Sequence, residues 1–287
     1  MDSFTKKKYI FNGELITSEN FNQLDFSNRS FRFGDSLFET IRYANKNILF
    51  LGDHILRLKL SMTTLKMKIP SYFSFEYFLD KISDIIYANN LQDGGARIRL
   101  TVYRSGSGAY YPETNEVNFL LEAEKLDSPY FLNISNGIVI DLYKDVFKPI
   151  NRLSSLKTGN ALIYILAAIN RDSLRLDDCL ILNEKANICE ATASNIFITK
   201  GNLIMTPPLE EGCINGIMRG QIKKIAENKK MLFIEKPFTQ HTILDAEEFF
   251  LTNTIQGIQW VRQFQSKLYE SKKTAQFFVD ELNNLIK

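Results

Sequence analysis

The chain has few cysteines and few histidines. Three cysteines (Cys179, Cys189 and Cys213) and two histidines (His54 and His241) occur among 287 residues. They are too few and too irregularly spaced for a disulfide framework or a Cys/His zinc cluster. We therefore expect no bound metal and a reducing, cytoplasmic setting.

The sequence also lacks a long apolar run and an excess of charge. No stretch approaches about 18 uninterrupted apolar residues, and no apolar signal-peptide run follows the N-terminal charges. Lys and Arg total 35 against 33 Asp and Glu, which gives a net charge of +2. From these absences we expect no membrane span, no secretion and no binding of nucleic acid by bulk charge. The basic cluster Lys6–Lys8 is typical of a solvated tail.

What the sequence does contain is the composition of a globular protein. It has 45% apolar and 24% charged residues over a length that can form two modest domains. Strand patterns outnumber helix patterns in both halves, which predicts an α/β fold with mixed sheets. A Ser-Pro break within residues 124–133 marks the boundary. We predict an N-terminal α/β domain over residues 1–128 and a C-terminal α/β domain over residues 129–287.

Apolar periodicity and turn residues predict the individual elements of both domains. In the first domain they predict hairpins at 12–13 and 45–47, helices over 52–67 and 75–89, and strands over 96–104 and 117–124. In the second they predict a strand over 137–143, a helix over 154–171, three short strands within 177–208, a helix over 216–228, and a last helix within 266–286 with Phe277, Leu282 and Leu285 on its packed face.

Lys157 is the first candidate for chemistry. Its neighbours in LSSLKTGNALIYILAA are small or apolar, and no carboxylate is near in the sequence. Desolvation lowers the pKa of an amine, which an amine needs in order to attack a carbonyl and form a Schiff base. An ordinary structural lysine explains this pattern equally well, so the wider set of motifs has to decide.

Six motifs occur in order along the chain: FRFGDSLFETIR, HILRLKLS, LKTGN, NICEATASNIF, LEEGCINGIMR and FLTNTIQGIQWV. Together they resemble the class IV aminotransferases, the fold-type IV pyridoxal 5'-phosphate (PLP) enzymes, over about residues 28–262. That family includes branched-chain aminotransferases, D-amino acid aminotransferases and aminodeoxychorismate lyases. The resemblance implies a two-domain, D-amino acid aminotransferase-like architecture with PLP between the domains. It also implies a homodimer in which the loop 104–113 reaches toward the neighbouring subunit's site.

The resemblance further implies roles for individual residues. Lys157 matches the lysine that forms the Schiff base with PLP and then carries the proton between substrate and cofactor. Glu190 matches the glutamate that pairs with the pyridine nitrogen and keeps it protonated. The remaining cofactor matches are to the phosphate site and are Arg57, Gly216, Ile217, Met218 and Thr254.

The substrate-side residues leave the reaction open between two members of the family. Arg42 and Arg99 stand where branched-chain aminotransferases bind the side-chain carboxylate of glutamate, although an alternating strand also places arginines on its wet face. The lyase is favoured by three other features, which resemble aminodeoxychorismate lyases more than aminotransferases: Arg104, the NGIMR string and Asn253. These four residues are the candidates for substrate binding.

Two departures from the family patterns bear on this choice. Ala109 stands where the lyases commonly carry an arginine. Trp260 stands where their last motif has a proline before a valine. Ala109, Tyr110 and Tyr111 occupy the loop in which D-amino acid aminotransferases place an arginine and a histidine, so that activity is the least expected of the three.

We predict a PLP-dependent class IV aminotransferase acting on small molecules. It would transfer an amino group between an L-amino acid, branched-chain or similar and with glutamate as donor, and a 2-oxo acid. The alternative is 4-amino-4-deoxychorismate lyase, which releases pyruvate and 4-aminobenzoate. A protein that only binds the cofactor is more remote, because Lys157, Glu190 and Arg57 are all present.

Overall fold

The computed structural model describes residues 7–17, 19, 27–132 and 136–286. These residues form two compact units. The first extends to Tyr130 and includes Lys157–Asn160, and the second contains Phe131–Leu156 and Ala161–Leu285. Both units contain a sheet and helices, so the predicted α/β class is confirmed. The boundary at residue 128 stays a prediction, and Lys6 lies outside the described residues. Every helix in the described part of the chain is too short or too polar to cross a bilayer.

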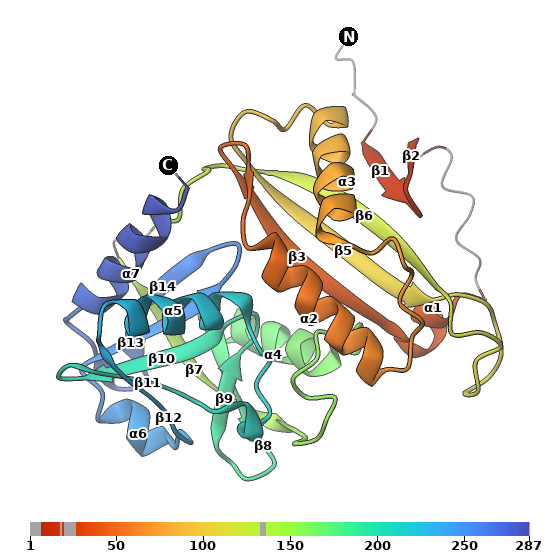
Figure 1. The fold of residues 1–287 in the computed structure, drawn as a ribbon. Helices are drawn as coiled ribbons and strands as arrows, with labels where there is room; N and C mark the ends of the chain where they lie inside the picture. Colours follow the sequence, from red (N-terminus) through yellow and green to blue (C-terminus); the bar gives the residue numbers. More distant parts are fainter. Residues whose placement is uncertain (1–6, 18, 20–26, 133–135, 287) are drawn as a thin grey trace. The chain divides into compact units, whose positions relative to one another are not determined.

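The first unit is a six-stranded antiparallel sheet with the order β2-β1-β6-β5-β3-β4 (Figure 1). Its strands are β1 (Lys8–Phe11), β2 (Glu14–Thr17), β3 (Ser36–Ala44), β4 (Asn47–Ile48), β5 (Gly95–Arg104) and β6 (Val117–Leu126). Its helices are α1 (Arg29–Phe33), α2 (Leu51–Thr64) and α3 (Phe75–Ala88). The predicted hairpin at 45–47 is confirmed, because Asn45 and Lys46 both have positive φ (47° and 68°) between the paired strands β3 and β4.

The two faces of this sheet differ in chemistry because side chains alternate along each strand. Leu37, Glu39 and Ile41 of β3 share one face, and α2 packs against this strand. Phe38 and Arg42 lie on the opposite face. In the antiparallel register Arg99 of β5 stands opposite Thr40 and therefore also lies on that face, and Arg97 stands opposite Arg42 in the same way.

The second unit contains a nine-stranded mixed sheet with the order β12-β11-β10-β13-β14-β7-β8-β9, and β15 pairs with β14. Its strands are β7 (Ile138–Lys148), β8 (Asp178–Asn183), β9 (Ile188–Ala191), β10 (Asn195–Lys200), β11 (Leu203–Thr206), β12 (Leu232–Glu235), β13 (Glu248–Asn253), β14 (Gly257–Phe264) and β15 (Lys267–Leu268). Its helices are α4 (Leu162–Ser173), the 3-10 turn η2 (Leu209–Glu211), α5 (Ile217–Asn228), α6 (Gln240–Leu244) and α7 (Lys273–Asn284).

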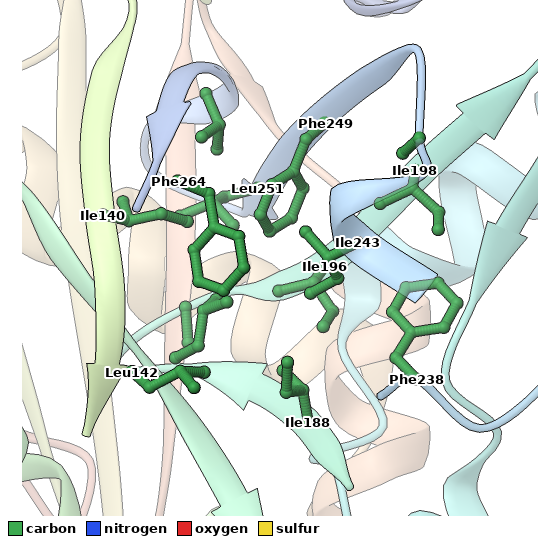
Figure 2. Close-up of a cluster of buried hydrophobic side chains, with 14 of the residues drawn as sticks. Ile140, Leu142, Ile188, Ile196, Ile198, Phe238, Ile243, Phe249, Leu251 and Phe264 are labelled. Carbon is green, nitrogen blue, oxygen red and sulfur yellow. The ribbon is translucent and has the colours of Figure 1, made fainter. Parts of the chain in front are cut away.

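A buried apolar cluster holds the strands of this unit together (Figure 2). It combines side chains of β7, β9, β10, β13 and β14 with residues of α6 and the segment before it. Phe249 is central, with its ring 6.3 Å from that of Phe264 and 5.9 Å from that of Tyr269, both edge-on.

Three sequence-based predictions about elements were wrong. The helix predicted over 154–171 begins only at Leu162, because residues 157–160 pair with β3 instead. Four strands, not three, lie within 177–208, because the bend at 192–194 separates β9 from β10. The last helix buries Phe278 and Leu282, whereas Leu285 is 55% exposed.

Candidate active site

Lys157 is held by main-chain hydrogen bonds between its segment and the start of β3. The amide N–H of Phe38 donates to the carbonyl of Lys157 over 2.9 Å, and the amide of Gly159 donates to the carbonyl of Ser36, also over 2.9 Å. A Cβ on residue 159 would lie 2.3 Å from Ser36 Oγ. The glycine in LKTGN is therefore required for this close approach, which places the lysine beside β3.

The Lys157 amine and the Arg99 guanidinium both lie over the ring of Phe38. Its Nζ lies 4.2 Å from the centroid of the Phe38 ring, and Arg99 Cζ lies 3.9 Å from the same centroid. The two cationic groups are therefore within about 8 Å of each other, which is the sum of these distances. Burial lowers the pKa of Arg99, and the neighbouring charge of Glu122 opposes this effect. An amine and a guanidinium thus lie on one face of the first sheet, and the binding of glutamate by Arg99 stays a prediction.

Arg57 of α2 is bound by a buried carboxylate on the helix-covered face of the same sheet. Its Nε donates to Glu39 Oε1 over 2.9 Å, and its Nη2 donates to Glu39 Oε2. His54 Nδ1 lies 2.6 Å from the same Oε2. Burial raises the pKa of Glu39, but the charge and hydrogen bonds of Arg57 and His54 outweigh it and hold this pKa at about 2. The carboxylate is therefore ionised and fixes one edge of the guanidinium.

Arg42 binds the chain segment just before the second unit. Its Nη2 donates to the carbonyls of Ser128 and Tyr130 over 2.7 and 3.0 Å. Burial lowers its pKa to about 10, so it stays charged at neutral pH. These contacts give Arg42 a structural role, and its binding of glutamate stays a prediction.

Arg104, like Arg42, donates hydrogen bonds to other groups of the protein. Its Nε donates to Asp35 over 2.9 Å and its Nη2 to the carbonyl of Leu65 over 2.7 Å, and its Nη1 donates to Asn115. The guanidinium is buried and holds the ends of three segments together. The predicted substrate contact of Arg104 has no support in these contacts, which explain its position without a ligand.

The loop that follows β5 is anchored by Arg29. This side chain pairs with Asp35 over 2.9 Å and donates to the carbonyls of Ala109 and Tyr110 over 2.6 and 3.3 Å. The rings of Tyr110 and Tyr111 are 89% exposed. The loop therefore has a fixed backbone and presents two aromatic side chains outward.

Glu190 in the second unit lies on β9 and is almost fully buried. Its Oε1 accepts from Lys148 Nζ and, over 2.8 Å, from the hydroxyl of Tyr164, and its Oε2 accepts from the amide of Ile214 over 2.8 Å. A carboxylate offers about four lone-pair directions. Glu190 is thus an oriented carboxylate with one lone-pair direction left for a further donor.

The charge of Glu190 also affects the neighbouring groups. Burial and the adjacent carboxylate raise the pKa of the Tyr164 hydroxyl and of the Cys189 thiol. The same two causes, burial first, raise the pKa of Cys213 to about 12. Both thiols are therefore protonated at neutral pH and are poor nucleophiles.

The N-terminus of α5 is built on a close contact of Gly216. A Cβ at this position would lie 1.9 Å from Asn195 Oδ1, and the side-chain Nδ2 of Asn195 donates to the carbonyl of Ile214 over 2.8 Å. In the described chain no side chain caps this helix, and its first turn contains no acidic residue. The amides of the turn that begins with Ile217 and Met218 therefore form a positively polarised site suited to an anion.

Thr254 lies in the tight turn between β13 and β14. Asn253 holds this turn, because its Oδ1 accepts from the amides of Ile255 and Gln256 over 2.9 and 2.7 Å, and its Nδ2 donates to Ser194 Oγ over 3.0 Å. These contacts position the turn that carries Thr254, and the binding of substrate by Asn253 stays a prediction.

Within each unit the structure groups part of the predicted site. Lys157 and Arg99 share the Phe38 ring in the first unit, and Glu190 is tied to the start of α5 through Ile214 in the second. Four residues around the predicted ones were not found from the sequence: Glu39 contacts Arg57, His54 contacts Glu39, and Lys148 and Tyr164 contact Glu190. A signal for the first existed, because a charged residue at an apolar position of the alternating strand β3 indicates a buried partner.

Comparisons with known proteins identify the family of this chain. A family model described as amino-transferase class IV matches residues 36–264. A putative branched-chain-amino-acid aminotransferase of Methanocaldococcus jannaschii is 28% identical over 279 residues, covering 94% of this chain and 92% of the relative. A D-alanine aminotransferase of Bacillus licheniformis is 24% identical, covering 86% and 84%.

Solved structures share the fold. A branched-chain aminotransferase of Thermoproteus uzoniensis, crystallised with norvaline, superposes with a TM-score of 0.87 at 22% identity, covering 98% of this chain and 95% of the other. A putative 4-amino-4-deoxychorismate lyase of Legionella pneumophila gives a TM-score of 0.83 at 25% identity, covering 95% and 98%. The fold predicted from the six motifs is confirmed.

Proposed function

Because the chain belongs to the class IV aminotransferase family, as the motifs predicted, we propose that it is a PLP-dependent enzyme that transfers an amino group from glutamate to a 2-oxo acid with a branched-chain or similar side chain. The observation that carries the proposal is the placement of Lys157. Its segment is hydrogen-bonded to β3, and its amine lies over the Phe38 ring within about 8 Å of the Arg99 guanidinium.

The residues present fit PLP. The donor set contains a primary amine for the cofactor aldehyde (Lys157), a buried carboxylate with room for a pyridinium N–H (Glu190), and an arginine for the phosphate (Arg57). The close contact of Gly216 leaves the start of α5 without a side-chain cap, which suits a phosphate oxygen. When bound, PLP supplies the electron sink that weakens the bond to the substrate α-hydrogen.

Lys157 and Glu190 would carry out the proton chemistry. Lys157 Nζ would accept the α-proton from the substrate and would donate it again to complete the amino-group transfer. Glu190 would hold a proton at the pyridine nitrogen of bound PLP, and the orientation of this carboxylate is set by Lys148, Tyr164 and the main-chain amide of Ile214. A neutral side chain in place of Glu190 would not hold that proton.

Arg99 is the residue we assign to the side-chain carboxylate of glutamate. It lies on the same sheet face as Phe38, and its side chain is about one third exposed, whereas Arg42 is buried and donates to two carbonyls. A planar guanidinium matches a carboxylate in two parallel hydrogen bonds.

Aminodeoxychorismate lyase is the second candidate. The NGIMR string favours it, and the solved structure of a putative lyase is 25% identical to this chain. Two of the residues that favoured it, Arg104 and Asn253, are explained by internal contacts. Transamination is therefore the better supported reaction.

Two parallel assays of the PLP-loaded protein distinguish these reactions. In one, glutamate or a branched-chain L-amino acid is added and conversion of the cofactor to its amine form is followed by absorbance. In the other, aminodeoxychorismate is added and pyruvate and 4-aminobenzoate are measured. We expect conversion with glutamate and no pyruvate. Pyruvate at each turnover, with negligible conversion by every amino acid, would replace the aminotransferase by the lyase.

A homodimer is part of the proposal. The stripe formed by Leu162, Ile165, Leu166 and Ile169 runs along α4 at helical spacing, and each of these side chains is at least 43% exposed. Such a stripe is typical of an interface. Light scattering after size exclusion should give the mass of two chains, and Ile169→Lys should shift the protein toward one. A monomeric parent protein would contradict this part.

We also propose a cytoplasmic setting. All three cysteines are free and buried, as in proteins of reducing compartments. Fractionation of the source cells with an antibody against the chain tests this, and recovery in a secreted fraction would contradict it.

A further inference from the structure

We propose that Glu39 and His54 are positioning residues that orient Arg57 and so set how strongly this chain distinguishes a phosphorylated ligand from its unphosphorylated form. The inference rests on the proposed function, because it takes Arg57 as the phosphate-binding arginine. It adds two residues that act through Arg57 without touching the ligand.

The geometry fixes the guanidinium along one edge. Nε and Nη2 of Arg57 donate to the two oxygens of Glu39, so the plane of the guanidinium follows the plane of the carboxylate. Glu39 comes from β3 and Arg57 from α2, so this pair also fixes α2 against the strand that positions Lys157. An arginine held in this way loses less freedom when it binds an anion.

His54 fixes the carboxylate in turn. It is fully buried on α2, three residues before Arg57, and its Nδ1 lies 2.6 Å from Glu39 Oε2. Burial lowers the pKa of His54, so the ring is neutral at pH 7 and its one N–H is at Nδ1, where the carboxylate accepts it. The charged groups that act on the ring are Glu39, Arg57 and Asp53.

The second nitrogen of His54 argues against a role in stability alone. Among the described residues Nε2 has no hydrogen-bond partner, and it is buried. A buried polar atom without a partner opposes folding, and an apolar side chain would avoid that cost. A histidine at this position is therefore explained by what its Nδ1 does for Glu39, and through Glu39 for Arg57.

The test compares the affinities of the cofactor-free full-length protein for PLP and for pyridoxal, which lacks the phosphate. The ratio of the dissociation constant for pyridoxal to that for PLP measures the preference for the phosphorylated ligand. It isolates the phosphate contact from changes in the rest of the site. His54→Leu removes the donor, and His54→Asn keeps an N–H near the position of Nδ1. Arg57→Ala is the reference, and Leu58→Ala is the control, because Leu58 is buried on the same helix.

We expect Arg57→Ala to abolish most of the preference for PLP and His54→Leu to lower it about tenfold. His54→Asn should restore most of it, and Leu58→Ala should leave it within about twofold although it destabilises the fold. An unchanged ratio in His54→Leu, with a lowered ratio in Arg57→Ala, would overturn the inference and leave the proposed function intact.

Two further outcomes are distinguishable. An unchanged ratio in Arg57→Ala would remove Arg57 from the phosphate site and the inference with it. If His54→Leu does not fold, Glu39→Gln decides, because it keeps an acceptor oxygen but weakens the bond to Arg57. A lowered ratio then supports the positioning role, and an unchanged ratio overturns it.

Discussion

The buried pair Lys148–Glu190 should show strong energetic coupling. Both side chains are at most 6% exposed, and the ammonium donates directly to Oε1 of the carboxylate. Glu190→Gln leaves the Lys148 charge buried without a counter-ion, and Lys148→Met does the same to Glu190. Breaking a buried pair from one side costs about 3–5 kcal/mol in the free energy of unfolding. Replacing both partners removes both charges, so the double variant should be more stable than either single variant.

Urea unfolding of the cofactor-free protein, followed by circular dichroism at pH 7, measures this cycle. The control is the same double-mutant cycle on the more exposed pair Lys229–Glu281, in which Lys229 Nζ lies 2.8 Å from Glu281 Oε1. An exposed pair should give a coupling energy below about 1 kcal/mol. If the double variant of Lys148 and Glu190 is destabilised by the sum of the single effects, the two charges do not interact as described, and Lys148 has no part in holding Glu190.

Three further perturbations test other parts of the account. Arg99→Ala should raise the KM for glutamate roughly 30-fold, which corresponds to about 2 kcal/mol for a lost charged hydrogen-bonded pair. Arg42→Ala should mainly lower the melting temperature of the protein. The reverse pattern would exchange the roles of the two arginines. Gly216→Ala should weaken PLP binding and cost about 1–3 kcal/mol of stability, because its Cβ would overlap Asn195; a PLP titration equal to that of the parent would refute this. Since burial lowers the pKa of His54 in the folded state, unfolding takes up a proton below about pH 6.5, so stability should fall as the pH falls below that value. His54→Leu should remove this part of the pH dependence, and an identical profile in both proteins would contradict it.

Much of the fold could be predicted because its signals are local. The helix predicted over 52–67 is α2 at Leu51–Thr64, and the helix predicted over 75–89 is α3 at Phe75–Ala88. Both are amphipathic, and a periodic apolar stripe needs no knowledge of what it packs against. The alternation in residues 96–104 likewise identifies β5 and shows which of its arginines share a face.

Contacts between distant segments explain what could not be predicted. Residues 157–160 lie within the helix predicted over 154–171, but they hydrogen-bond to β3, more than a hundred residues earlier. Arg104 resembles a strand-end arginine available to a ligand, and only the fold brings Leu65 and Asp35 to it. Lys148 gives no local signal at all, because its partner Glu190 is on another strand.

The same limit applies to the reaction. Arg42 and Arg99 lie on the same face of the neighbouring strands β3 and β5, and both are candidates for binding glutamate. The structure separates them, since Arg42 is bound to the carbonyls of Ser128 and Tyr130, whereas Arg99 lies over the Phe38 ring. The assignment of glutamate recognition therefore depends on contacts that no single strand encodes.

The identity of the lysine that binds PLP is the most direct test of the central claim. The PLP-loaded protein is reduced with borohydride, digested, and the peptide that carries the pyridoxyl group is sequenced by mass spectrometry. We expect the label on Lys157 and no labelled peptide in Lys157→Ala, with the same protein left unreduced as the control. A label on any other lysine of the parent protein would contradict it.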